Sequence, residues 1–393
     1  MQVTAPLTHL GDITIEEFLR DYWQKKPLLI RNAFPDFESP ISGEELAGMG
    51  LEEQIESRLV LEHGEEGPWQ LRTGPFTEDD FFALPKTHWT LLVQAVDQWI
   101  PEVAELKQRF RFLPDWRLDD VMISYAADQG SVGPHYDFYD VFLLQAEGKR
   151  RWQLGPRADG SSPRVEGTPL NILKEFEAEN SWVLEPGDML YLPPQFSHWG
   201  IAEGGCTTIS VGFRAPSART MLEDLAAELA FGLPDHLRYS DPDLKPAANP
   251  AEIDRDSVAR VQAQLTRWLE QPQNVGQWFG AVMTEAKYPD TVAMDAGTAE
   301  DWRETLASGG YLILNPGSRC AFFRDPETLF VDGESFPAPL LFAEPFCLNH
   351  TIDESDLANY PELTQPDGVI DQLVAQGSLI YPDSEQDWDE EES

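Results

Sequence analysis

GPHYDFYDVFLLQAEGKRRWQL, residues 133–154, carries the strongest signal in the sequence. His135 and Asp137 stand two residues apart, and side chains at that spacing in an extended strand project from the same face. Asp140 is an odd number of residues from both and is expected to point elsewhere. A histidine and a carboxylate on one face supply two of the three ligands of the facial triad, which holds Fe(II) and leaves coordination positions open.

The third ligand has one obvious candidate, His198, in the stretch EPGDMLYLPPQFSHWG at residues 185–200. A turn at Pro186-Gly187, a short apolar strand and a Pro-Pro pair precede this histidine. We therefore predict that His135, Asp137 and His198 converge on one metal ion. For either member of the first pair alone, the simpler alternative is a histidine satisfied in the core or an aspartate that caps a turn.

A basic run, KRR, follows one strand after the pair. An oxygenase with such a triad needs a cation for the distal carboxylate of 2-oxoglutarate, and a planar guanidinium can donate two hydrogen bonds to it. Arg150 shares a strand face with Trp152, an expected core residue, so Arg150 is preferred and Arg151 is the alternative. Ser124 or Tyr125, on the preceding strand, could add a hydroxyl.

The remaining histidines have no carboxylate partner at strand spacing, and we predict structural or surface roles for them. They are His9, His63, His88, His236 and His350. The pair Glu62-His63 lies beside a glycine turn and is expected to be solvated.

The chain of 393 residues has 28 basic and 69 acidic side chains, giving a net charge of −41. Such a charge repels a phosphate backbone, so direct nucleic-acid binding is not expected. A basic protein partner would be attracted instead. Adaptation to a saline environment is an alternative origin of the acidity. The length predicts two or three domains.

Three observations bear on location. No segment has the roughly 18 continuous apolar residues of a membrane span, and the first residues lack the basic start and apolar core of an export signal. Cys206, Cys320 and Cys347 are scattered and form no CxxC pair, which favours a reducing compartment. We expect a cytoplasmic protein without membrane partners.

The first part of the chain mixes helices with strands. Residues 13–24 have the apolar spacing of an amphipathic helix. Ser42 is predicted to cap a second helix, with Glu45 completing a capping box. Residues 57–72 predict a hairpin. Residues 89–99 predict a helix, because four apolar side chains fall on one face. A buried strand is expected at 28–30.

From Asp119 short strands recur between Gly and Pro turns, which indicates an antiparallel sandwich or barrel. A turn at Glu147-Gly148 is expected to separate two of the strands. The polar segment 156–178 is expected to end in a short helical piece. Strands are predicted at 121–125, at 138–144 and 149–154, and at 182–184, 189–192 and 207–213.

Helical patterns begin near Ala215, and apolar stripes mark two helices on either side of a Pro-rich linker at 242–250. From about residue 297 a small α+β unit follows. It combines helices at 302–306 and 368–376 with a strand at 311–314 and a hairpin turning at 325–327, which suggests a winged-helix-like unit. The acidic end, DSEQDWDEEES, is expected to be disordered.

The quoted stretches, together with ISVGFRAP at residues 209–216, resemble the JmjC-type cupin oxygenases. More closely, they resemble the bacterial ribosomal oxygenases that hydroxylate an arginine of large-subunit ribosomal protein 16. The resemblance includes ITIEEFLRDYWQKKPLLIRNAF near the start and extends to about residue 285. One departure is Gln195, which stands where the cupin motif usually has glycine.

The resemblance implies a mainly β plus α fold. Its parts are a double-stranded β-helix (jelly-roll, cupin) catalytic domain at 1–214, a helical dimerisation domain at 215–296, a winged-helix-like domain at 297–383 and an acidic tail at 384–393. It further implies Fe(II) on His135, Asp137 and His198, 2-oxoglutarate held by Arg150 and Ser124, and dioxygen as the oxidant.

The family also implies a homodimer whose substrate is a basic ribosomal protein. Two alternatives remain from the sequence. One is a 2-oxoglutarate oxygenase that acts on another basic protein residue or on an RNA base. The other is a non-catalytic cupin that serves as a binding scaffold.

Overall fold

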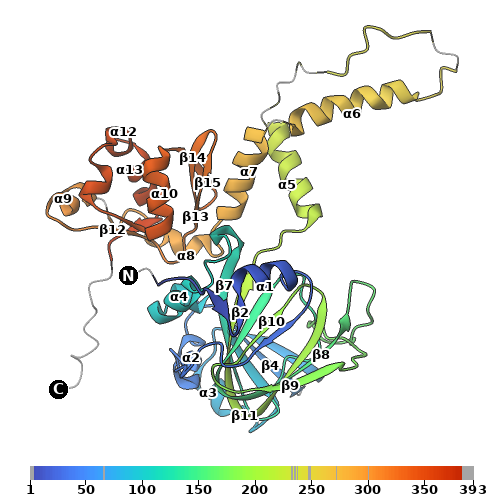
Figure 1. Ribbon diagram of the computed structural model, residues 1–393, viewed down its shortest axis with the longest axis vertical. Helices are drawn as coiled ribbons and strands as arrows, with labels where there is room; N and C mark the ends of the chain where they lie inside the picture. Colours follow the sequence, from blue (N-terminus) through green and yellow to red (C-terminus); the bar gives the residue numbers. More distant parts are fainter. Residues whose placement is uncertain are drawn as a thin grey trace. The chain divides into compact units, whose positions relative to one another are not determined.

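The computed structural model describes residues 4–64, 67–231, 233, 236, 238–246, 249–270, 272–299 and 301–382. The predicted acidic tail at 384–393 lies outside these residues. The chain divides into two compact units, Met1–Ala215 and Pro216–Ser393 (Figure 1).

The first unit is built on antiparallel strands in the order β3-β10-β8-β11-β7-β6-β4-β5, with β9 beside β8. Figure 1 shows these strands curling into a barrel. The barrel expected from the strand spacing is therefore confirmed. The strands are β3 (Leu28–Ile30), β4 (Ser57–Gly64), β5 (Gly67–Thr73), β6 (Trp89–Val93), β7 (Leu118–Ala126), β8 (Val141–Arg157), β9 (Asn180–Leu184), β10 (Met189–Leu192) and β11 (Phe196–Phe213), and a separate pair is β1 (His9–Leu10) with β2 (Ile13–Thr14).

Strands β8 and β11 run the length of the barrel and bend midway. The first part of β8 pairs with β10 and its second part pairs with β9, while both parts pair with β11. The bends fall at Gly148 and Gly204, whose φ angles of 63° and 80° suit glycine. The predicted turn at Glu147-Gly148 is wrong, because the strand continues through this bend.

The same bend shifts the alternation of side chains along β8. Thr207 of β11 lies opposite Glu147 and the adjacent Thr208 lies opposite Gln145, so β8 has one residue more than its partner at this point. Such a bulge reverses which residues face inward. As a result Gln145 and Arg150, an odd number of residues apart, both approach Thr208.

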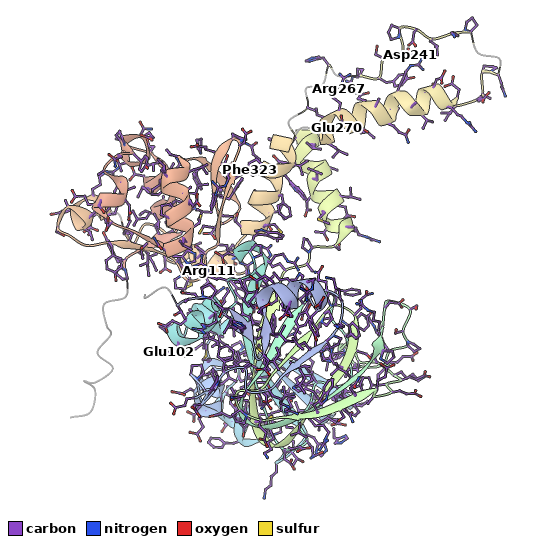
Figure 2. All side chains as sticks on the ribbon, viewed as in Figure 1. Glu102, Arg111, Asp241, Arg267, Glu270 and Phe323 are labelled. Carbon is purple, nitrogen blue, oxygen red and sulfur yellow. The ribbon has the colours of Figure 1, made fainter. Side chains whose placement is uncertain are left out.

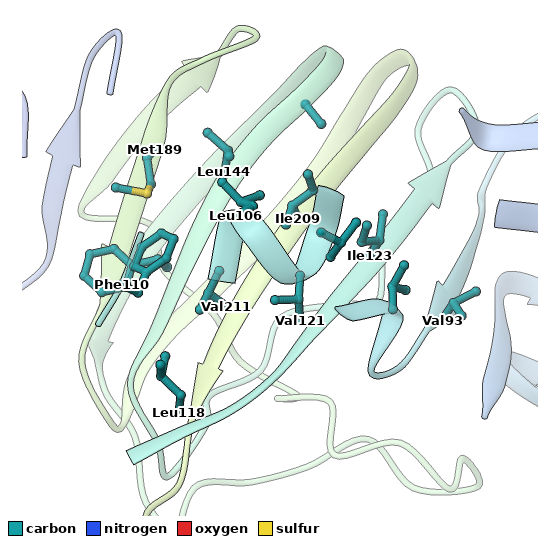
Figure 3. Close-up of a cluster of buried hydrophobic side chains, with 14 of the residues drawn as sticks. Val93, Leu106, Phe110, Leu118, Val121, Ile123, Leu144, Met189, Ile209 and Val211 are labelled. Carbon is teal, nitrogen blue, oxygen red and sulfur yellow. The ribbon is translucent and has the colours of Figure 1, made fainter. Parts of the chain in front are cut away.

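The main core lies where the barrel packs on the N-terminal helices. Figure 3 shows part of it, with side chains of the strands meeting Leu106 of a helix and Phe110 just after it. Capping boxes formed by Thr14 with Glu17 and by Ser42 with Glu45 start the first two helices, the second as predicted. The helices of this unit are α1 (Ile15–Asp21), α2 (Gly43–Met49), α3 (Glu78–Phe82) and α4 (Pro101–Gln108), with 3-10 turns η1 (Val96–Gln98) and η2 (Asp115–Arg117).

Two predicted helices are absent from the described residues of this unit. Residues 89–93 form β6, with Leu91 paired to Leu59 on one side and to Tyr125 on the other. Two neighbouring strands thus override a helical spacing of apolar residues. No helix forms within 156–178, and Ile172 of that segment packs into a small apolar cluster instead.

The second unit combines helices with two three-stranded sheets, β13-β14-β15 and β16-β12-β17. The predicted helix at 302–306 and the hairpin are present, and β15 extends the hairpin. In Figure 2 Phe323 marks β13, and its ring approaches Gly276 of α7 closely. The elements are α5 (Ala218–Phe231), α6 (Arg255–Leu269), α7 (Pro272–Thr284), α8 (Pro289–Ala293), α9 (Trp302–Ala307), β12 (Leu312–Leu314), β13 (Cys320–Arg324), β14 (Glu327–Val331), β15 (Glu334–Pro337), α10 (Leu340–Asn349), β16 (Thr351–Ile352), α11 (Glu354–Leu357), α12 (Pro361–Thr364), α13 (Val369–Ala375) and β17 (Leu379–Ile380).

A core of its own supports this unit. Trp302 of α9, Leu329 of β14 and Leu373 of α13 are among its buried side chains. None of the helices within the described residues is both long and apolar enough to cross a membrane.

Candidate metal centre

The centre begins with a main-chain contact between two segments that are distant in sequence. His135 is not part of a strand, contrary to prediction, but it forms an isolated antiparallel bridge with His198 at the start of β11. The His135 N–H donates to the His198 carbonyl at 3.0 Å, and the His198 N–H donates back at 2.8 Å. Residues that face each other in this way put their side chains on the same side.

Asp137 joins the two imidazoles. Its Oδ2 atom lies 4.0 Å from His135 Nε2 and 3.7 Å from His198 Nε2. Each imidazole is held at its other nitrogen, His135 Nδ1 by the Gly133 carbonyl and His198 Nδ1 by the Phe196 carbonyl, both at 2.9 Å. A proton on Nδ1 leaves Nε2 with its lone pair directed at the carboxylate side, as metal ligation requires.

The surroundings of His198 favour its neutral form. Burial, followed by the neighbouring His135, lowers the pKa of His198 to about 4. A neutral imidazole is the form that ligates a metal ion. The nearby charge of Asp137 is the main reason that the pKa of Tyr139 lies above its usual value, so the Tyr139 hydroxyl lies close to this carboxylate. Tyr139 was not predicted from the sequence, because nothing in its spacing shows that its hydroxyl turns back to Asp137.

A buried cation on β8 is linked to the triad through Trp152, whose ring centroid lies 5.9 Å from that of His198. Arg150 is only 3% exposed, and its Nη1 atom lies 3.3 Å from both Ser124 Oγ and Thr208 Oγ1. Burial lowers the pKa of Arg150. No carboxylate among the described residues pairs with this guanidinium, and its Nε has no hydrogen-bond partner there. A buried, unpaired cation is costly unless an anion joins it.

Packing leaves room for this cation only because of a glycine. A Cβ atom on Gly200 of β11 would lie 2.9 Å from Arg150 Nε and 2.7 Å from the Trp152 ring. The guanidinium also lies over that ring, 5.2 Å from its centroid. Gly200 therefore permits the close approach of two large side chains from β8.

The alternatives named from the sequence point elsewhere. Arg151 forms a surface ion pair with Glu203. The Tyr125 ring packs against Trp89 and not beside Arg150. Thr208 also contacts Arg150 but was not predicted from the sequence. It lies opposite Ser124 in the pairing of β11 with β7, and knowledge of that pairing would have identified it.

Asp140 has a structural position. It is fully buried and accepts hydrogen bonds from Gln24 Nε2 at 2.9 Å, Tyr191 OH at 2.6 Å and Arg117 Nη2 at 3.2 Å. These donors fasten the segment after α1 to the barrel. Neither solvation at a strand end nor contact with a substrate fits a carboxylate enclosed in this way.

Gln195 occupies a position where the cupin motif usually has glycine, and its backbone conformation is that of a glycine. Its φ angle is 70°, a left-handed conformation that glycine adopts without cost. The Gln195 N–H donates to the Asp137 carbonyl at 2.7 Å. The backbone at this position thus keeps the conformation of the motif although the side chain is larger.

These side chains fit the metal ion and the 2-oxoglutarate that the sequence implies. Two imidazoles with directed Nε2 atoms and one carboxylate form the donor set of a facial triad. The unpaired guanidinium with two hydroxyls matches a distal carboxylate. A barrel with this cluster defines the JmjC class of cupins, and the family model described as JmjC domain matches residues 105–221. A second model, described as ROXA-like winged helix, matches residues 265–380.

Within that class, the chain belongs to the ribosomal oxygenase family. It is 36% identical over 325 residues to "Ribosomal protein uL16 3-hydroxylase" of Escherichia coli (strain K12), covering 82% of this chain and 85% of the relative. It is 33% identical over 333 residues to "Probable ribosomal oxygenase" of Haemophilus influenzae (strain ATCC 51907 / DSM 11121 / KW20 / Rd), covering 82% of each chain.

Solved structures agree with this assignment. The chain matches the X-ray structure of E. coli ycfD with a TM-score of 0.82 and 32% identity, covering 96% of this chain and 100% of that one. It matches the same ribosomal oxygenase in complex with cobalt and 2-oxoglutarate with a TM-score of 0.78 and 33% identity, covering 93% of this chain and 97% of that one.

Proposed function

We propose that this chain is an Fe(II)- and 2-oxoglutarate-dependent hydroxylase that acts on an arginine side chain of large-subunit ribosomal protein uL16. The proposal depends on one observation, the convergence of His135, Asp137 and His198 beside the buried, unpaired Arg150. The name of the E. coli relative supports uL16 as the substrate, and the arginine comes from the resemblance of the sequence motifs.

The chain's own residues have defined roles in this proposal. Nε2 of each histidine and a carboxylate oxygen of Asp137 would hold the ion, and the Nδ1 contacts to carbonyl groups would keep the rings oriented. Arg150, with Ser124 and Thr208, would hold the distal carboxylate of 2-oxoglutarate. When bound, Fe(II), 2-oxoglutarate and dioxygen supply the oxidising chemistry, and the barrel supplies position and shelter from water.

The charge of the chain supports a basic substrate. At −41 it attracts a cationic protein and repels free RNA. A ribosomal substrate also agrees with the cytoplasmic location expected from the sequence.

Two measurements test the proposal. Purified protein should release succinate only when Fe(II), 2-oxoglutarate and a uL16 peptide or ribosomal protein fraction are all present. Mass spectrometry of ribosomal proteins from cells with and without the gene should show one added oxygen atom on an arginine peptide of uL16. Oxygen on another residue or on RNA would favour a different hydroxylase, and a lack of succinate under all conditions would favour a scaffold.

We further propose that residues 215–296 form a dimerisation domain. On α6, Val258, Val261, Leu265 and Leu269 are each 45–51% exposed and recur at helical spacing on one side. The helix packs against α7, and Figure 2 shows side chains projecting around it up to Arg267 and Glu270. An apolar stripe with this exposure is typical of a protein interface, and a second copy of the chain is the partner that the family resemblance implies.

A further inference from the structure

A second cluster of potential metal ligands lies in the first unit. One ligand atom each from Glu62, His63 and His88 falls within 4.8 Å of the other two. Besides the triad, this is the only such group found within the described residues. From the sequence, Glu62-His63 is expected to be solvated because it lies beside a glycine turn, and His88 is expected to be structural or at the surface.

Strand pairing brings the three residues together. Glu62 and His63 lie near the end of β4, and His88 directly precedes β6, the neighbouring strand. The Glu62 N–H donates to the His88 carbonyl at 3.0 Å. The imidazole rings of His63 and His88 are 5.0 Å apart between centroids. The main-chain contact between Glu62 and His88 thus continues the pairing of β4 with β6 by one residue beyond β6.

The backbone of His88 is also unusual. Its φ angle of 65° lies in the left-handed region, which is less favourable for a residue with a side chain than for glycine. Glycine would adopt this conformation without strain, yet a histidine occupies the position. Such outliers concentrate at sites where a particular side-chain direction is needed.

The donor atoms suit a transition-metal ion. His88 Nδ1 contacts Thr87 Oγ1 at 2.8 Å, which leaves its Nε2 for a ligand. Two imidazoles and a carboxylate, with water in the fourth position, form a common set for zinc. Zinc bonds of this kind separate the donors by about 3.3 Å. His63 is exposed, and the other two are only partly buried, so small rotations can close the remaining gap.

We propose that Glu62, His63 and His88 bind a zinc ion at a site separate from the triad. The net charge of the chain, −41, favours the binding of cations in general. The carboxylate of Asp128 is close enough for its charge to interact with His88, and a hydrogen bond from the Gly204 N–H is the main reason that its pKa lies below the usual value.

A zinc ion bound to His88 would restrain the segment that leads to the triad. The His88 N–H donates to the Asp128 carbonyl at 2.9 Å, and the Asp128 carboxylate accepts from the Gly204 N–H at 2.8 Å. Asp128 stands in the connection between β7 and His135. An ion on His88 would thus restrain both this connection and the bend of β11.

The test is a zinc titration of untagged, full-length protein, freed of metal, against a chromophoric chelator. A variant with His135→Ala and His198→Ala removes the triad and should still bind one zinc ion. Adding His63→Gln, or Glu62→Gln in a separate variant, should abolish that binding. His9→Gln, at an exposed histidine in β1, is the matched control and should leave it unchanged.

A second measurement tests whether zinc restrains the segment that leads to the triad. Zinc should raise the melting temperature of the triad-free variant and should slow amide exchange at residues 127–131, and both effects should vanish with His63→Gln. If the triad-free variant binds no zinc, or binds it equally with and without His63, the proposal is overturned. Neither result depends on hydroxylase activity, so this site can fail or stand independently of the proposed function.

Discussion

His135 and His198 exchange main-chain hydrogen bonds, so the backbone sets the relation between their imidazoles. The rings lie 4.2 Å apart between centroids, and each Nδ1 is held by a carbonyl group two residues earlier in the chain. Side-chain contacts are not needed to bring them together. A metal ion would enter a site whose two nitrogen donors are already placed, which lowers the cost of ordering the ligands.

This arrangement predicts that the triad can be removed without loss of the fold. His135→Ala should abolish Fe(II) binding and succinate release, because two remaining ligands cannot hold the ion in this geometry. Its main-chain bridge to His198 does not require the imidazole, so the circular dichroism spectrum and melting temperature of the metal-free protein should stay close to those of the wild type. Metal analysis and a succinate assay are the measurements.

His9→Ala is the control for the loss of a histidine, since His9 is exposed on β1. This variant should keep both metal and activity. Substantial 2-oxoglutarate turnover by His135→Ala would contradict the assignment of His135 as a ligand of the iron.

Arg150 should affect 2-oxoglutarate binding and stability in opposite directions. Arg150→Met would remove the charged hydrogen bonds proposed to hold the distal carboxylate of 2-oxoglutarate, which are worth about 1.5–3 kcal/mol. The Kd for 2-oxoglutarate should therefore rise about ten- to hundredfold. Without ligand the same variant should be at least as stable as the wild type, because it replaces a buried, unpaired cation with an apolar side chain.

Arg151→Met is the matched control, because Arg151 is the next residue of β8 and pairs with Glu203 at the surface. It should leave the Kd unchanged. Calorimetric titration with 2-oxoglutarate and urea unfolding of the metal-free protein measure the two effects. An equal loss of affinity in both variants would show that general charge, and not this pocket, attracts the ligand.

The parts of the site that follow from spacing could be predicted from the sequence. The spacing of two residues selects His135 and Asp137, although the structure has neither of them in a strand. Arg150 is selected because it shares a strand face with Trp152, an expected core residue. Thr208 could not be found in this way. Its approach to Arg150 depends on the bulge opposite Thr207, and a shift of register leaves no mark in the composition of either strand.

The fold shows the same division between local and non-local information. A capping box depends on only four consecutive residues, and the capping box of Ser42 with Glu45 was predicted correctly. Residues 89–93 have helical apolar spacing, but partners on both sides hold them as a strand. Those partners, β4 and β7, are separated from β6 in the chain, so the outcome is decided by tertiary pairing.

Asp140 should produce a pH dependence of stability. Burial raises the pKa of its carboxyl above the ordinary value of 3.8, although hydrogen bonds from Gln24 and Tyr191 and the charge of Arg117 oppose this. The folded chain then holds the proton more tightly than the unfolded chain does. This contribution to stability is complete below pH 3.8 and is lost as the pH rises through the folded pKa.

Asp140→Asn cannot titrate, so it isolates this effect from that of the many other carboxyl groups. The free energy of unfolding of the wild type minus that of the variant should fall as the pH increases across this window. Urea unfolding at a series of pH values measures the difference. A difference that is constant, or that grows with pH, would mean that the three donors outweigh burial and hold the carboxylate charged.

The apolar stripe of α6 should control oligomeric state. Leu265→Glu puts a charge in the middle of the stripe, where a second copy is proposed to pack, and burial of an unpaired charge opposes association. The dimer should dissociate to monomers, as measured by sedimentation equilibrium. Ala263→Glu adds the same charge to the same helix but away from the stripe, and it should leave the dimer intact. If both variants sediment like the wild type, the stripe is not the interface; if both dissociate, the added charge and not its place on the helix is responsible.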